Sequence, residues 1–366
     1  MLRLQTPLPE RYRIASDGDL ADMIGQAKAA LGSRLFILGH HYQRDEVMQW
    51  ADARGDSFGL SRLAAGQTEA EFIVFCGVHF MAESADVLTG DHQRVLLPDL
   101  NAGCSMADMA NIDQVTEAWD EMADVVDTSG VVPITYMNSS AALKAFVGRH
   151  GGAVCTSSNA RAVLTWALGE GRGDQVLFFP DQHLGRNTGY ELGYGADDMR
   201  VWNPRLALGG LTDVEVKEST LLLWKGHCSV HQRFRPEHIA AFRAEHPDGI
   251  VMVHPECAHE VVELADLVGS TDNLIRGVAA APPGAVIGIA TEIHLVKRLG
   301  DETPDKTVVC LDPLVCPCST MSRIDGPHLA WVLEGLVEGD VRNQISVDAE
   351  TAEWARVALE RMLAIT

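Results

Sequence analysis

Short apolar runs that end in polar side chains recur along this chain, and stretches with helical spacing separate them. The runs at 34–42 and 71–79 are rich in Leu, Ile, Val and Phe, and each leads into histidine. Residues 17–31 place apolar side chains at helical intervals behind Ser16 and Asp17, residue types that cap helix N-termini. Short buried strands that alternate with helices are typical of parallel α/β layers. The pattern therefore predicts an α/β fold with parallel sheets.

The order of these elements repeats three times. Each series has a strand that ends in polar groups, a helix opened by a hydroxyl residue, a second strand end and, last, a cysteine. The interval from the second strand end to the cysteine is 25 residues in the first series, 47 in the second and 26 in the third. The longer second interval predicts an insertion near residues 184–204. We predict three repeated α/β/α domains at 1–112, 113–234 and 235–366, the last with additional C-terminal helices.

Pairs of polar side chains stand at the end of the first strand of each series. They are His40 with Tyr42, Tyr136 with Asn138, and His254 with Glu256. The members of each pair are two positions apart, so both side chains would point to the same face of an extended strand. Ligands bind at the carboxyl ends of parallel strands, and a glutamate beside a histidine suits general acid–base chemistry. A lone histidine or tyrosine is often structural, but three equivalent pairs favour a site.

Hydroxyl residues open the predicted helices that follow these strands. Ser57, Ser157 and Thr271 occupy these positions. N-capping is the ordinary role of such residues. Three helix N-termini that met at one centre would also offer backbone N–H donors to a small anionic ligand. The two roles are compatible.

Three cysteines, Cys104, Cys228 and Cys318, each close one series. Cysteine thiolates hold iron–sulfur clusters, and a set of three leaves one iron open to act as a Lewis acid. We therefore expect a [4Fe–4S] cluster on these cysteines. A local alternative is a structural zinc site that uses Cys310, Cys316 and Cys318, which would need a fourth ligand.

The remaining thiols have simpler interpretations. Cys76, Cys155 and Cys310 lie in or after apolar runs and are expected to be small buried hydrophobes. The chain starts without a basic stretch followed by an apolar core, so we expect a cytoplasmic protein in which a disulfide framework does not form.

The excess of acidic over basic residues narrows the classes of molecule that the protein is expected to bind. The 366 residues include 29 basic and 51 acidic side chains, a formal net charge of −22. Such a charge repels nucleic acid and anionic membrane surfaces. The apolar stretches are too short or too interrupted by proline to predict a membrane span. An anionic ligand must therefore be held by local donors such as helix N-termini.

A series of motifs in order resembles the quinolinate synthase family, iron–sulfur enzymes of NAD biosynthesis. The motifs are GHHYQRDEV, GDSFGLS, GVHFMAESADVL, LPDLNAGCSMAD, YMNSSAALKAF, CTSSNA, KGHCSVH, HPEC, GSTDNL, TEIHLVKRL and CPCSTMSRI. The resemblance runs from Gly39 to Leu329, most of the chain.

This resemblance implies three α/β domains about a pseudo-threefold axis with a [4Fe–4S] cluster at the centre. It implies condensation of iminoaspartate with dihydroxyacetone phosphate to quinolinate, with loss of phosphate and water. It assigns the cluster to Cys104, Cys228 and Cys318. The matching substrate and catalytic positions are His40, Tyr42, Ser57, Tyr136, Asn138, Ser157, His254, Glu256 and Thr271.

Within that set, proton transfer is assigned to two pairs, Glu256 with His254 and Tyr42 with His40. Tyr136 is a further catalytic candidate, which with Asn138 would orient the aldehyde for ring closure. Which residue carries which proton stays open. The imine could come from a partner L-aspartate oxidase or by diffusion.

One departure concerns the last cluster ligand. Some family members carry a run of three cysteines there, whereas this chain has Cys316-Pro317-Cys318. The Cys-x-x-Met pattern selects Cys318, and Cys316 and Cys257 are then additional thiols with a possible redox role. The alternative function is an iron–sulfur redox sensor or regulator without turnover, which would need a partner-binding surface.

Overall fold

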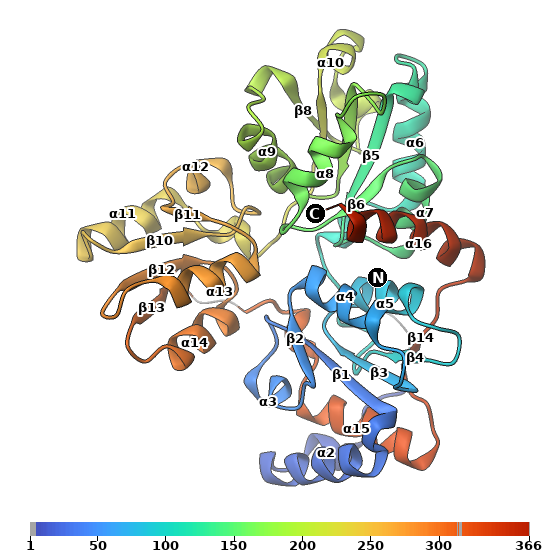
Figure 1. Ribbon diagram of the computed structural model, residues 1–366, viewed down its shortest axis with the longest axis vertical. Helices are drawn as coiled ribbons and strands as arrows, with labels where there is room; N and C mark the ends of the chain where they lie inside the picture. Colours follow the sequence, from blue (N-terminus) through green and yellow to red (C-terminus); the bar gives the residue numbers. More distant parts are fainter. Residues whose placement is uncertain (1–4, 313, 315–316, 366) are drawn as a thin grey trace. The chain divides into compact units, whose positions relative to one another are not determined.

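The computed structural model describes residues 5–312, 314 and 317–365 (Figure 1). Three sheets, parallel except for one short edge strand, organise these residues, and helices follow most of the strands. The α/β class predicted from the alternating pattern is confirmed. Among the described residues, no helix is long and apolar enough to cross a membrane.

The first sheet has the strand order β2-β1-β3-β4-β14. Its strands are β1 (Leu35–His40), β2 (Ala53–Gly55), β3 (Phe72–Cys76), β4 (Arg94–Leu96) and β14 (Gln344–Ile345). Only β14 pairs antiparallel. The accompanying helices are α1 (Glu10–Arg13), α2 (Asp17–Leu31), α3 (Asp45–Met48), α4 (Ser57–Gly66), α5 (His79–Leu88) and α15 (Gly326–Glu338). A capping box between Ser16 and Asp19 starts α2, close to the predicted start.

The second sheet has the order β6-β5-β7-β9-β8. Its strands are β5 (Val131–Tyr136), β6 (Ala153–Cys155), β7 (Gln175–Phe179), β8 (Met199–Trp202) and β9 (Leu221–Trp224). The helices are α6 (Ile112–Ala123), α7 (Ala141–Arg149), α8 (Ala160–Ala167), α9 (Gln182–Glu191), α10 (Asp213–Glu218) and α16 (Ala349–Ala364). The predicted insertion supplies β8, which pairs with β9 as an edge strand.

The third sheet has the order β11-β10-β12-β13. Its strands are β10 (Ile250–Val253), β11 (Leu267–Val268), β12 (Val286–Ala290) and β13 (Thr307–Cys310). Its helices are α11 (Pro236–Glu245), α12 (His259–Val262), α13 (Thr271–Ala280) and α14 (Ile293–Glu302). When the strands of each sheet are numbered by their order in the chain, they lie in the same spatial order in all three sheets: second, first, third, fourth. The strand β8 of the insertion is left out of this numbering. The predicted repeat is therefore confirmed.

The chain divides into two compact units. The first comprises Met1–Cys104 and Pro317–Asp348, and the second comprises Ser105–Cys316 and Ala349–Thr366. The second unit holds both the second and the third sheet, so the predicted boundaries at residues 112 and 234 stay a prediction. The C-terminal helices join earlier elements, because α15 packs on α2 and α16 packs on α7.

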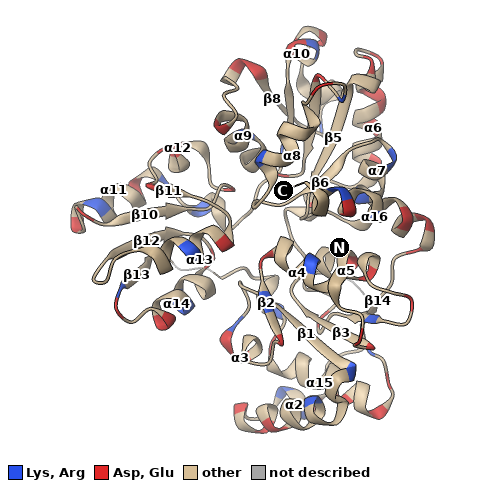
Figure 2. Cartoon of the chain, viewed as in Figure 1, with Lys and Arg blue, Asp and Glu red and all other residues tan. Residues whose placement is uncertain are grey.

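Close helix packing holds α16 in the second unit. A Cβ atom at Gly148 of α7 would lie 2.0 Å from the backbone oxygen of Trp354, so only glycine permits this approach. Acidic residues lie along α6, as Figure 2 shows. Asp113, Glu117 and Asp120 of that helix are exposed.

Candidate functional site

A buried tyrosine–glutamate pair links the ends of two strands in the second unit. Tyr136 is the last residue of β5, and Glu256 follows β10 by three positions. The Tyr136 hydroxyl donates to Oε1 of Glu256 at 2.5 Å, and both residues are 4% exposed. The structure thus brings together two strand-end groups that sequence reasoning placed in different repeats.

His231 completes this cluster from a short helical turn after β9. Its Nδ1 lies 2.7 Å from Oε2 of Glu256, and its Nε2 lies 3.3 Å from the hydroxyl of Thr291. Its ring stacks on that of His254, with ring centres 4.5 Å apart and an interplanar angle of 18°. The side chain is 1% exposed. Sequence reasoning missed His231, although its position three residues after Cys228 was a signal.

The electrostatics of the cluster favour a charged glutamate beside a neutral histidine. Burial raises the pKa of Glu256. The neighbouring His231, and the hydrogen bonds that Glu256 forms with His231 and Tyr136, lower it by more, so the pKa lies below its usual range. Burial, and then the neighbouring His231, lower the pKa of His254 to about 3. The Nδ1 of His254 accepts from the backbone N–H of Glu256. An ionised carboxylate therefore lies next to an unprotonated imidazole.

A second buried carboxylate, Asp181, lies after β7. Its Oδ1 accepts from the backbone N–H groups of His183 and Leu184 and so caps α9. Its Oδ2 is buried without a hydrogen-bond partner among the described residues. Burial, and then the charge of Glu256, raise the pKa of Asp181 well above its usual range. Two nearby carboxyl groups with pKa values pushed apart are typical of acid–base sites.

Asn138 is the other predicted group at the end of β5. Its side-chain oxygen Oδ1 is buried and has no hydrogen-bond partner among the described residues. A buried acceptor of this kind calls for an explanation, and a bound ligand is one. The predicted role of Asn138 in substrate binding stays a prediction.

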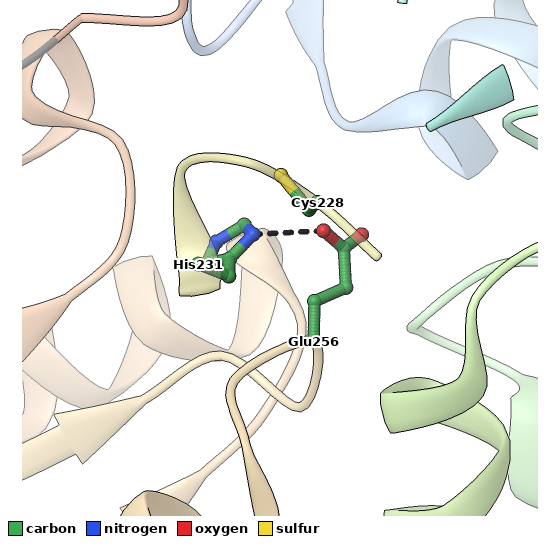
Figure 3. Close-up of side chains that lie close together, drawn as sticks. All are labelled: Cys228, His231 and Glu256. Carbon is green, nitrogen blue, oxygen red and sulfur yellow. Dashed lines mark hydrogen bonds and ion pairs between the residues drawn. The ribbon is translucent and has the colours of Figure 1, made fainter. Parts of the chain in front are cut away.

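Cys228 lies beside the cluster and adds a third kind of metal ligand. Its sulfur, a ring nitrogen of His231 and a carboxylate oxygen of Glu256 all lie within 4.8 Å of one another. Figure 3 shows the three side chains turned toward one another, with the His231–Glu256 contact marked. Cys228 is half-buried, whereas the other two are buried.

The first unit holds the predicted pair of His40 and Tyr42. His40 ends β1 and is 4% exposed, and its Nδ1 accepts from the backbone N–H of Tyr42 at 3.1 Å. The two rings meet edge to face with centres 4.8 Å apart. His40 and Tyr42 therefore lie together as the spacing predicted, and their catalytic role stays a prediction.

The three predicted cluster cysteines share one local structure. Each is half-buried, and each stands three residues before a short 3₁₀ turn. The turns are η2 (Ala107–Met109) after Cys104, η6 (His231–Arg233) after Cys228 and η7 (Met321–Arg323) after Cys318. Half-exposed thiols in equivalent loops are better suited to bind a metal than to pack in the hydrophobic core. Cys316 lies outside the described residues, so the choice of Cys318 and the local zinc alternative stay predictions.

The other thiols differ from these three. Cys76, Cys155 and Cys257 are fully buried, and burial raises the pKa of each thiol, to about 12 for Cys76. The core interpretation of Cys76 and Cys155 is confirmed, and burial of Cys257 disfavours a redox role. Cys310, expected in the core, is only half-buried on β13, with its pKa raised by burial to about 11.

The expectation that Ser57, Ser157 and Thr271 cap their helices is wrong in each case. Asp56 caps α4, Ser270 caps α13, and Asn159 occupies the N-cap position of α8. Ser57 and Thr271 are instead the first helical residues, and Ser157 lies two positions before Asn159. Asp56 and Ser270 are the N-caps of α4 and α13 because the side chain of each accepts a hydrogen bond from a backbone N–H group of the first turn. The binding role of the three hydroxyls stays a prediction.

Comparisons with known proteins extend over nearly the whole chain. A family model described as "Quinolinate synthetase A protein" matches residues 22–364. A quinolinate synthase of Corynebacterium glutamicum is 57% identical over 99% of this chain and 91% of its own. Quinolinate synthases of Rhodopirellula baltica and Bacillus anthracis are 53% and 50% identical, over 97% and 98% of this chain and 93% and 97% of theirs.

Proposed function

We propose that this chain condenses iminoaspartate with dihydroxyacetone phosphate, because it belongs to the quinolinate synthetase A family of NAD-biosynthesis enzymes. The products are quinolinate, phosphate and water. The observation that carries the proposal within the structure is the buried cluster of Tyr136, His231, His254 and Glu256 beside Cys228. The alternative of a regulator without turnover is not favoured, since these relatives are named as enzymes.

The cofactor of the proposal is a [4Fe–4S] cluster on Cys104, Cys228 and Cys318. Their shared position ahead of a 3₁₀ turn supports equivalent roles in the three repeats, and their partial exposure suits thiolate ligands. When bound, such a cluster supplies one iron without a cysteine ligand, a Lewis acid for a substrate oxygen.

Glu256 is our candidate for the general base of the enolisation. It is ionised, its carboxylate is fixed on one side by Tyr136 and on the other by His231, and a fixed base transfers protons efficiently. The hydroxyl of Tyr136 can pass a proton between substrate and Glu256. The Nδ1 of His254 accepts from the backbone N–H of Glu256, so the neutral ring offers its Nε2–H as a donor in the dehydration steps. His40 and Tyr42 are the corresponding candidates in the first unit.

Anionic groups of the substrates need donors, because the chain carries a net charge of −22. Ser57, Ser157 and Thr271 stand at or just before helix N-termini without acting as the caps. We propose that these hydroxyls and the adjacent backbone N–H groups bind carboxylates and phosphate. The buried oxygen of Asn138 is proposed to accept a hydrogen bond from the substrate. The imine would be supplied by an enzyme that oxidises aspartate, such as an L-aspartate oxidase.

The test is turnover by anaerobically reconstituted protein. We expect the broad visible absorption of a [4Fe–4S] cluster and formation of quinolinate from the two substrates. A loaded cluster with no quinolinate would contradict the proposal. Cys318→Ala should abolish the cluster absorption, and Cys316→Ala should leave it; the reverse would identify Cys316 as the ligand.

A further inference from the structure

We propose that the protein without its cluster binds one divalent transition-metal ion, with Zn²⁺ as the preferred ion, through Cys228, His231 and Glu256. The sulfur, nitrogen and oxygen atoms concerned lie within 4.8 Å of one another. Zinc bonds to these atoms are about 2.0–2.3 Å long, so one ion can reach all three after small side-chain movements. All three residues belong to the second unit, and the site therefore needs no ligand from the first.

The surroundings of the triad resemble the outer shell of a metal site. The ring of His231 has a hydroxyl partner, Thr291, at Nε2 on the side away from Glu256. The Glu256 carboxylate keeps the hydroxyl of Tyr136 on its other oxygen. Metal-ligating histidines and carboxylates are commonly oriented by such partners. The stacked ring of His254 fixes the plane of the His231 imidazole as well.

The charges of the ligands match the ion. In the metal-bound state Cys228 is a thiolate, Glu256 a carboxylate and His231 a neutral ring, so the site with Zn²⁺ is neutral overall. Binding releases the thiol proton of Cys228 to solvent. In the bound state the Nδ1 of His231 binds the ion and the single proton of the neutral ring is on Nε2, which donates to Thr291; any proton displaced from Nδ1 passes through solvent to Nε2, or stays in solvent where Nε2 already holds one. A water molecule completes four-coordination.

The ligand types select the class of ion. A thiolate, an imidazole and one carboxylate suit zinc, iron(II) and cobalt(II), whereas magnesium and calcium prefer oxygen ligands throughout. Cys228 is half-buried while His231 and Glu256 are buried, so the metal enters past the sulfur. Zinc also competes with the cluster, because a Cys228 thiolate bound to zinc cannot bind iron; this consequence rests on the proposed function.

The experiment is a Co²⁺ titration of cluster-free protein prepared with a chelator under anaerobic conditions. We expect one equivalent of Co²⁺ to bind, with thiolate-to-cobalt absorption and the intense visible bands of a four-coordinate site, and Zn²⁺ to displace it. Cys228→Ala should lose the thiolate absorption, and His231→Ala and Glu256→Ala should each weaken binding at least about tenfold.

Two further variants make the test specific. Cys310→Ala is the matched control, since Cys310 is another half-buried thiol of the second unit. It should bind Co²⁺ like the wild type, and loss of binding there would place the metal at the alternative site around Cys310 instead. Thr291→Val keeps the side-chain shape and all three ligands, yet should weaken binding about 10–100-fold because it removes the partner of Nε2. Unchanged affinity in His231→Ala and Glu256→Ala would overturn the proposal.

A final comparison separates this inference from the proposed function. Protein preloaded with Zn²⁺ should assemble its cluster more slowly from iron and sulfide than chelator-treated protein. If Co²⁺ does not bind but the reconstituted protein makes quinolinate, only the metal site is wrong. If Co²⁺ binds as described but no cluster or quinolinate forms, the proposed function is wrong and the metal site stands.

Discussion

Two tyrosine–glutamate pairs, one in each compact unit, show how burial and extra partners change the same chemistry. In the first unit Tyr12 donates to Glu334 at 2.7 Å, and Arg11, more than half exposed, also contacts that carboxylate. In the second unit Tyr136 donates to Glu256, which is buried and bound by His231. Burial and Glu334 raise the pKa of Tyr12, whereas the donors around Glu256 lower the pKa of that carboxyl group.

The difference lies in what can reach the carboxylate. Arg11 is always protonated, so it can only neutralise Glu334. The Glu256 carboxylate instead contacts an imidazole, because His231 lies against it and stacks on a second histidine, His254. The Tyr12–Glu334 pair is thus a built-in control for hydrogen bonding without acid–base function.

The largest effect is expected for Glu256→Gln. Glutamine keeps the shape and can still accept from Tyr136, but it cannot take a proton, so kcat should fall by about 10²–10⁴. The matched variant Glu334→Gln should keep kcat within about twofold of the wild-type value, since Glu334 is not proposed to transfer protons. Steady-state quinolinate formation by reconstituted enzyme measures both. Equal losses would show that the two pairs are both structural.

His231→Ala should destabilise the second unit by about 3–5 kcal/mol, because it leaves the Glu256 carboxylate buried without the side chain that contacts its Oε2. Urea denaturation of cluster-free protein measures this. The double variant His231→Ala with Glu256→Gln removes the uncompensated charge and should recover part of the loss. Arg11→Ala provides the contrast, with a loss below about 1 kcal/mol since that ion pair is exposed. Equal losses for the two single variants would erase the difference between the pairs.

Tyr136→Phe should cost about 1.5–3 kcal/mol, the range for a hydrogen bond to a charged, buried acceptor. Tyr12→Phe should cost less, because Arg11 and solvent still reach Glu334. The same denaturation measurement compares the two. A larger loss at Tyr12 would contradict the view that the second-unit carboxylate depends on its tyrosine.

Much of the fold followed from apolar runs, because a parallel sheet needs buried strands and these are visible in sequence. The polar groups at the ends of β1, β5 and β10 were also predictable, since strand ends place side chains at one edge of a sheet. The Tyr136–Glu256 bond joins residues 120 positions apart, and its partner choice depends on packing that no local pattern encodes. The contact of His231 with Glu256 depends on the same packing, although its position three residues after Cys228 is a local signal.

The helix caps show a different limit. Two residues able to cap stand side by side at these helix starts, Asp56 with Ser57 and Ser270 with Thr271, and a shift of one residue in the helix start decides which of them is the cap. Helix starts are uncertain by a residue or two from sequence alone. The placement of the C-terminal helices was likewise beyond local reasoning, because α16 packs on α7 through a close contact between Gly148 and Trp354, residues far apart in the chain.

The smallest effect, and the sharpest test of charge state, is expected for Asp181→Asn. Asp181 is buried like Glu256 but forms no ion pair among the described residues, and its pKa is raised well above the usual range by burial and by Glu256. Asparagine can accept the same two backbone N–H groups of α9, so at about pH 4 the variant should match the wild type within about 1 kcal/mol.

The pH dependence then decides the matter. Below the unfolded-state pKa of about 3.9 both states of the wild type hold the Asp181 proton. As the pH rises, the unfolded chain loses it while the folded protein keeps it, so the wild type loses stability until the pH passes the folded-state pKa. The amide in the Asp181→Asn variant does not titrate, and the variant should therefore become more stable than the wild type between about pH 4 and pH 7. Urea midpoints at several pH values measure the difference. A variant that loses ground as the pH rises would show that Asp181 is ionised in the folded protein, and the contrast between the two buried carboxyl groups would vanish.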